Sequence, residues 1–268
     1  MKTIINWRVF FILWIASVIA IIAILPYTLE LQSGVLEQLD LPIPIPILIA
    51  IQVIQSGLLF AVCTFLGMLL AKRIGLGTPV LDAVARGESA LNKVRAFLSI
   101  SIGLGILASV LIIGLDAYIF QPALIQELGE NANALNLTVQ PAAWKGFLAS
   151  FYGGIAEEIL LRLFVMSLLA WLGSFINKTK DGRPTNIIFW IANILAAILF
   201  GLGHLPAVAT IIPITTLVII RTVILNSIGG IMFGWLYQKH GLESAMIAHF
   251  SADIVLHVLL VLQTEHLF

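Results

Sequence analysis

Three charged side chains interrupt a long apolar stretch of this 268-residue sequence. Glu157, Glu158 and Arg162 lie within residues 153–162, among neighbours that cannot solvate them. At helical pitch Glu158 and Arg162 share a face, with the acid N-terminal to the base, whereas Glu157 is turned by about 100°. A charge near a bilayer centre costs about 2.5 to 3.5 kcal/mol or more. Three such charges predict a functional site; the alternative is an internal ion pair that only fixes helix packing.

Two later apolar segments carry further ionisable groups at helical spacing. His204 follows Phe200 by four residues, and His249 precedes Asp253 by four, so that the carboxylate could orient the imidazole. A lone histidine is more often a packed side chain, and His257, one turn further on, is interpreted in that way. Taken together the groups favour one site, because charges inside a membrane face the bundle interior and pair with each other.

The composition places these groups in a polytopic membrane protein. Hydrophobic residues make up 60% and charged residues 10%, and the mean hydropathy of +1.07 exceeds what a soluble core could bury. Fourteen basic and fourteen acidic residues leave no net charge, which excludes an electrostatic footprint for nucleic acid. The single cysteine, Cys63, excludes an intramolecular disulfide and is expected to be buried.

The predicted fold class is all-α: a transmembrane helix bundle of seven to eight spans, with the active site inside the bundle. Apolar runs place the first four spans at residues 9–25, 47–71, 96–120 and 144–172. The first resembles the start of a signal peptide, but no small-x-small cleavage site follows, so a retained helix is expected. The third contains Gly103, Gly105 and Gly114, small residues that let helices approach closely.

The charges of the connections predict one orientation, with the N-terminus inside. Connections expected inside carry clustered basic residues, namely Lys2, Arg8, Lys72, Arg73, Arg86, Lys93, Arg95, Lys178, Lys180 and Arg183. Connections expected outside, residues 26–46 and 121–141, lack Lys and Arg and carry Glu30, Glu37, Asp40, Glu127 and Glu130. Asp116 is expected at the membrane interface. The protein would then be a multi-pass membrane protein, in the plasma membrane if it is bacterial.

The C-terminal half allows two span counts. Residues 185–204 and 244–262 each form a span, and another ends near residues 237–241. Residues 205–220 contain Pro206 and Pro213, and they either cross the membrane, giving eight spans, or lie re-entrant or at the interface, giving seven. Depth favours eight, because with seven His249 would enter from the inner face, far from His204, unless helices are kinked or long. Lys239 is the one charge against eight.

The three motifs in this order resemble the signature of the CPBP intramembrane proteases. These motifs are Glu157-Glu158-x-x-x-Arg162, Phe200-x-x-x-His204 and His249-x-x-x-Asp253. The family includes CAAX prenyl endopeptidases of the Rce1 type and bacterial proteins called Abi. The resemblance divides one integrated membrane domain into residues 1–143, helices without motifs, and residues 144–268, the catalytic helices. In the family the last motif ends in Asn or Asp, so Asp253 fits.

The resemblance implies an intramembrane endopeptidase acting on a peptide bond of a membrane-associated or lipidated substrate. Glu157 would activate water, assisted by His204, and His249 and Asp253 would face the carbonyl oxygen. The supporting ion pair would be Glu158 and Arg162. The expected partners are a peptide or membrane-protein substrate and membrane lipids, without nucleic acid. The choice of Glu157 as the base rests on the resemblance and not on spacing.

Two questions stay open at the level of the sequence. The family has been described both as metalloproteases and as glutamate-dependent enzymes, so either no cofactor is required or Glu157, His204 and His249 hold a zinc ion. The sequence has a glutamate pair and no HExxH motif, which favours the mechanism without a cofactor. One alternative function is a proton-coupled transporter, but the chain shows no inverted repeat of the kind that many transporters have. The other is a non-catalytic immunity or partner-binding protein, and the presence of all three motifs argues against it.

Overall fold

A computed structural model describes residues 5–36, 42–129 and 141–265 of the chain and confirms the all-α class within them. The predictions for Lys2, Glu37, Asp40 and Glu130 lie outside these residues. Six described segments are long and apolar enough to cross a membrane, namely Trp7–Leu31, Ile45–Ile74, Leu91–Leu128, Asn186–Val208, Thr216–His240 and Leu242–Gln263. A seventh long helix, residues 143–173, carries the glutamate pair and Arg162.

The first half of the chain contains three of the long helical segments. Their elements are α1 (Trp7–Ala23), α2 (Leu25–Leu31), α3 (Ser33–Leu36), α4 (Ile45–Ile74), α5 (Pro79–Ala85), α6 (Leu91–Leu115), the π-helical η1 (Asp116–Phe120) and α7 (Gln121–Leu128). The Asn6 side chain accepts a hydrogen bond from the Arg8 amide and caps α1. Gly75, at φ 79°, terminates α4 in the left-handed conformation that glycine tolerates.

The second half contains the motif-bearing helices. These elements are α9 (Ala143–Phe151), η2 (Tyr152–Glu157), η3 (Ile159–Met166), α10 (Ser167–Gly173), α11 (Asn186–Val208), α12 (Thr216–His240), α13 (Leu242–Asp253), η4 (Ile254–Leu259) and α14 (Leu260–Glu265). Within the helix of residues 143–173, the turns before and after the glutamate pair are π-helical. Such turns are rare and occur mostly at functional sites.

Residues 205–220 form no span of their own. Residues 205–208 form the end of α11, with Pro206 in its last turn. Residues 216–220 form the start of α12, and the Thr215 side chain caps its first turn. Within the described residues, the six candidate spans and the helix of residues 143–173 give seven long helices, so the depth argument for eight spans was wrong. All long helices then alternate in direction, and Lys239 no longer conflicts with the other charges.

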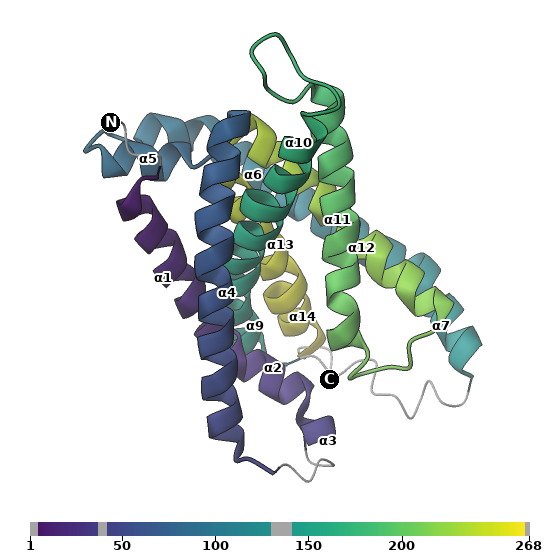
Figure 1. The fold of residues 1–268 in the computed structure, drawn as a ribbon. Helices are drawn as coiled ribbons and strands as arrows, with labels where there is room; N and C mark the ends of the chain where they lie inside the picture. The colour runs from purple at the N-terminus through teal and green to yellow at the C-terminus, as the bar shows by residue number, and fades with distance from the viewer. Residues whose placement is uncertain (1–4, 37–41, 130–140, 266–268) are drawn as a thin grey trace.

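The two ends of the bundle, which lie at the top and the bottom of Figure 1, differ in charge. One, here called the basic end, carries the starts of α1, α6 and α11 and the ends of α4, α10 and α12; its basic residues are Arg8, Lys72, Arg73, Arg86, Lys93, Arg95, Lys178, Lys180, Arg183 and Lys239. Contacts between distant segments fix this end, such as the hydrogen bond from the Leu242 amide to the Gly77 carbonyl, 3.0 Å. At the opposite end Lys145 pairs with Glu30 at 2.6 Å.

Close helix packing relies on glycine at the sites where backbones meet. A Cβ at Gly105 of α6 would overlap the Ala248 carbonyl of α13, and one at Gly230 of α12 would lie 2.7 Å from Ala197 of α11. Gly105 thus confirms its predicted role. Gly103 and Gly114 have no atom within 4 Å of such a Cβ, so for them the prediction was wrong. Cys63 is buried as expected.

Candidate active site

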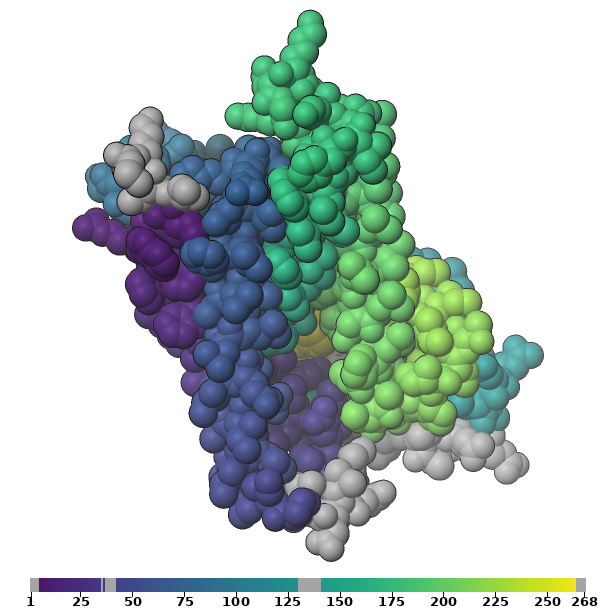
Figure 2. Space-filling model, viewed as in Figure 1, coloured from purple at the N-terminus to yellow at the C-terminus, as the bar shows by residue number. Residues whose placement is uncertain are grey.

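The motif-bearing side chains line one cavity of about 550 Å³ inside the bundle. Glu157, His204, His249 and Asp253 contribute to its wall, together with residues of α1, α2, α4 and α12. In Figure 2 the surface between α4 and α11 is hollowed, so that the deeper helices are visible behind it. Several described residues further along the wall are apolar, including Ile24 and Leu225. The cavity therefore joins a polar wall to an apolar one.

Glu158 lies buried behind the polar wall, which is formed by Glu157, His204, His249 and Asp253. Its Oε1 lies 3.1 Å from Nη1 of Arg162 and 2.8 Å from Nδ1 of His249. Glu158 is 0% exposed and Arg162 is 2% exposed, and Arg162 also donates to the Gly230 carbonyl at 3.1 Å. Because a carboxylate only accepts, His249 Nδ1 carries the hydrogen. The predicted Glu158–Arg162 pair is present, and it holds a histidine from another helix.

His249 directs its other nitrogen into the cavity, between two carboxylates. Nε2 lies 3.6 Å from Oε2 of Glu157 and 3.7 Å from Oδ1 of Asp253. Both distances exceed direct hydrogen-bond length, and groups at this spacing can share a water or a substrate atom. The sequence suggested that Asp253 orients the His249 ring. The hydrogen bond that orients the ring instead comes from Glu158, and the signal for it was absent from the spacing because the two residues are 91 positions apart.

His204 completes the wall from α11. Its Nδ1 lies 2.8 Å from the Phe200 carbonyl, which only accepts, so Nε2 is the nitrogen that faces Glu157, at 4.0 Å. The side chains of Glu157 and His204 are 18% and 34% exposed, in contrast to the buried Glu158. The more accessible glutamate is therefore the one that the resemblance assigns to water activation.

Gly153 leaves the space that this arrangement needs. A Cβ at this position would overlap Oδ2 of Asp253 and lie 3.0 Å from Nε2 of His249. Gly153 lies in η2, and because it has no side chain the helix that carries the glutamates can pack closely against α13. The sequence displays this glycine beside the glutamates, but its role depends on which helix packs over it.

Further aromatic and polar side chains surround the site, and two of them, Phe233 and Tyr27, were missed by the motif analysis. Phe233 stacks on the His249 ring at 4.9 Å, and the Arg162 guanidinium lies over the rings of Phe200 and Phe233 at 5.2 and 5.6 Å. His257 was expected to be a packing residue. It lines the cavity, and its Nδ1 lies 3.3 Å from the hydroxyl of Tyr27 in α2.

Glu157, His204 and His249 are the side chains that could hold a zinc ion. Within residues 5–36, 42–129 and 141–265, no group of three or more His, Cys, Asp or Glu side chains is arranged as a metal site. Two tetrahedral zinc ligands at roughly 2.0 to 2.1 Å from the ion lie about 3.3 Å apart, which is shorter than the 4.0 Å between Glu157 and His204. His249 Nε2 lies 3.6 Å from Glu157, so both histidines are more widely spaced from Glu157 here than two ligands of one zinc ion would be.

Comparison with known families identifies the segment that carries the site. Residues 139–255 match the family described as type II CAAX prenyl endopeptidase Rce1-like, which confirms the resemblance read from the three motifs. The match spans every proposed site residue from Glu157 to Asp253. No curated protein and no solved structure matches the chain. The matched segment is therefore similar to a CAAX-type endopeptidase domain, and the six long apolar helices support an integral membrane protein.

Proposed function

We propose that the protein hydrolyses a peptide bond of a membrane-associated substrate with water activated by Glu157. The observation that carries the proposal is the position of His249. Its Nδ1 is held by Glu158 at 2.8 Å, while its Nε2 faces both Glu157 and Asp253 across the cavity. This arrangement supports the proposal, because hydrolysis of an amide requires a base, a donor and a group that stabilises the oxyanion around one point.

In the proposed mechanism Glu157 removes a proton from water as the oxygen attacks the substrate carbonyl carbon. Glu158 and Glu157 lie against the two ring nitrogens of His249, and nearby carboxylates favour the protonated imidazole. His249 then donates from Nε2 to the developing oxyanion. Protonated Glu157 returns its proton to the leaving amine as the carbon–nitrogen bond breaks, which restores the starting carboxylate. His204 assists from the other side of Glu157.

Asp253 is proposed to be a second donor to the oxyanion. An ionised carboxylate cannot donate, so this role requires the protonated form. Two observations support it: Glu158 already accepts the hydrogen bond that orients His249, and Asp253 is only 9% exposed. We propose further that no metal takes part, since the carboxylates and imidazoles provide both proton transfer and oxyanion stabilisation.

The substrate class is proposed from the shape of the cavity. The polar wall lies inside the bundle. The apolar wall and the hollow between α4 and α11 suit an extended peptide that enters from the bilayer with an apolar or lipidated segment.

The basic end is proposed to face the cytoplasm, because Lys and Arg concentrate on that side of membrane proteins. Labelling of a cysteine at position 180 from outside intact cells would contradict this orientation.

The experiment that tests the function compares membrane proteomes. Cells with the intact protein, with Glu157→Gln and with Glu127→Gln would be analysed for protein termini created by cleavage. Glu127 is the matched control, because its carboxylate accepts a hydrogen bond from Thr215 at the end of the bundle opposite the basic end. We expect a set of new termini in the intact and Glu127→Gln cells that is lost with Glu157→Gln. Identical termini in all three would refute proteolysis by this site.

A further inference from the structure

A second cavity, of about 750 Å³, opens at the basic end of the bundle, away from the candidate active site. It is enclosed by the start of α1, the end of α4, and the connection that contains α5. Its charged lining residues are Arg8, Lys72, Arg86 and Asp82. Cations outnumber the one anion among the lining side chains, and Glu88, which does not line the cavity, pairs with Arg86. None of the three motifs contributes a side chain to it.

Each of the two lining arginines has N–H donors that no described hydrogen bond uses. A guanidinium has five N–H donors. Within the described residues Arg8 uses Nη1 for the Ala85 carbonyl at 3.4 Å, and Arg86 uses Nε and Nη2 for Glu88 at 2.6 and 2.8 Å. The planar donor fork of arginine matches the oxygens of a phosphate group better than a lysine ammonium does.

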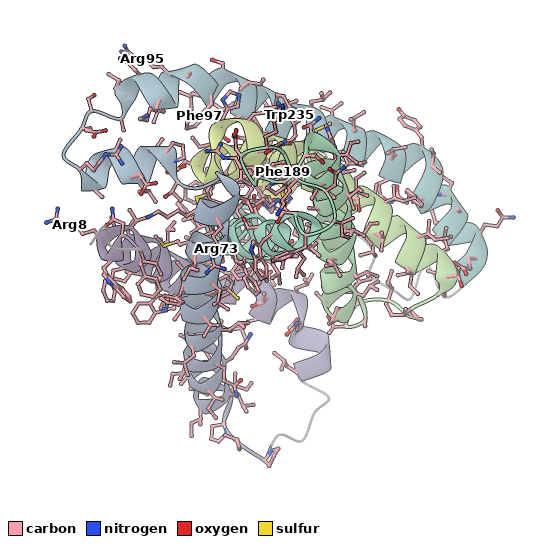
Figure 3. All side chains as sticks on the ribbon, turned by 45° about the horizontal axis from the view of Figure 1, so that its top comes forward. Arg8, Arg73, Arg95, Phe97, Phe189 and Trp235 are labelled. Atoms are coloured by element: carbon pink, nitrogen blue, oxygen red, sulfur yellow. The ribbon has the colours of Figure 1, made fainter. Side chains whose placement is uncertain are left out.

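The lining combines the polar Asn6 and Thr78 with apolar side chains. Met68, Leu76 and Leu163 contribute apolar walls. Trp7, which also lines the cavity, is 53% exposed, and tryptophan is enriched at the level of lipid headgroups. Figure 3, which brings the basic end forward, shows Arg8 at the edge of this face and Arg73 at the end of α4.

The outer surfaces below the cavity provide room for acyl chains. On α1 the exposed side chains include Phe11 and Ile15, and on α4 they include Leu59 and Val62. The two helices lie next to each other along one side of the molecule (Figures 1 and 2). A ligand with a phosphate head and two hydrocarbon tails would therefore satisfy both the cavity and the surface beneath it.

We propose that this cavity binds the phosphate headgroup of an anionic membrane phospholipid. Arg8 and Arg86 bind the phosphate oxygens, Lys72 adds positive charge, and the tails lie along α1 and α4. A basic cavity between membrane helices is a known physical solution for holding such headgroups. The proposal does not depend on the proteolytic function.

The test measures lipid binding by the purified full-length protein in a neutral detergent. Native mass spectrometry would determine the affinity for phosphatidylglycerol, for phosphatidylcholine and for inorganic phosphate. The cavity variant is Arg8→Gln/Arg86→Gln. Its matched control is Lys178→Gln/Lys180→Gln, which removes the same charge from the basic end at residues that do not line the cavity. Thermal unfolding without lipid checks that both variants fold, and the single Arg86→Gln replaces the double variant if it does not.

We expect phosphatidylglycerol to bind the intact protein and the control more tightly than phosphatidylcholine does. The cavity variant should bind phosphatidylglycerol about 30-fold more weakly, the effect of losing two cationic contacts. An equal loss in the control variant would show a general surface potential and overturn the site. Equal affinity for the two lipids would also overturn it. Binding of inorganic phosphate as tight as that of the lipid would assign the cavity to a free anion instead.

Discussion

Replacing Gly153 with alanine should abolish proteolysis while the protein stays folded. The added Cβ would overlap the Asp253 carboxylate and lie 3.0 Å from His249 Nε2. Both groups flank the proposed position of the substrate carbonyl. If the carboxylate moves on the order of 1 Å to relieve the overlap, the rate should fall by about 100-fold. Overpacking of this kind destabilises by about 1 to 3 kcal/mol, which a folded membrane protein can tolerate.

The assay is the cleavage rate of a substrate identified by terminal proteomics, together with the thermal unfolding midpoint in the same detergent. Gly103→Ala is the matched control, because it makes the same change in a helix, at a glycine whose Cβ would meet no atom within 4 Å. Both variants gain helix propensity of up to about 1 kcal/mol, so this contribution cancels. The reasoning is refuted if Gly153→Ala cleaves as fast as Gly103→Ala.

Three further predictions, each with its own variants, test the proposed roles within the site. Arg162→Met should destabilise the protein by about 3 to 5 kcal/mol, because it leaves the buried Glu158 charge without its cation, and Glu158→Gln/Arg162→Met should recover part of the loss; a single variant as stable as the intact protein in reversible unfolding would contradict this. His204→Ala and His249→Ala should both stop cleavage, but only His249→Ala should lower stability, by about 1 to 3 kcal/mol, because Glu158 loses a hydrogen bond; equal unfolding midpoints would argue against the bond. Asp253→Asn should retain substantial activity and Asp253→Leu should not, since the amide keeps a donor; measurement with chelator and with added zinc decides the metal question, because an inactive Asp253→Asn that zinc restores would overturn the metal-independent mechanism.

Local spacing predicted the contacts that lie within one helix. Glu158 and Arg162 are four residues apart, and the expected pair forms at 3.1 Å. The convergence of three motifs inside the bundle also followed from the sequence, since buried charges must find partners. What the spacing could not provide was the partner of each group across helices. The bond between Glu158 and His249, the space at Gly153 and the stacking of Phe233 all depend on how α12 and α13 pack against residues 143–173.

Depth along the helices was the point at which sequence reasoning failed. His204 lies 18 residues after Asn186, the start of α11, and His249 lies 7 residues after Leu242, the start of α13. At about 1.5 Å per residue these correspond to roughly 27 and 10 Å. Yet both imidazoles lie within 4.0 Å of Glu157. Helices that begin at one end of a bundle thus need not begin at one depth, and this relation between helices is set by tertiary packing.

The central claim is that Glu157 activates the water that cleaves the substrate. The most direct measurement is the turnover of a purified substrate by the intact protein, Glu157→Gln and Glu127→Gln, each reconstituted in lipid nanodiscs and matched for folded protein. The account predicts normal turnover for Glu127→Gln and a loss of at least about 100-fold for Glu157→Gln, because the amide cannot accept the proton of water. A Glu157→Gln protein that cleaves the substrate at the intact rate would contradict the account.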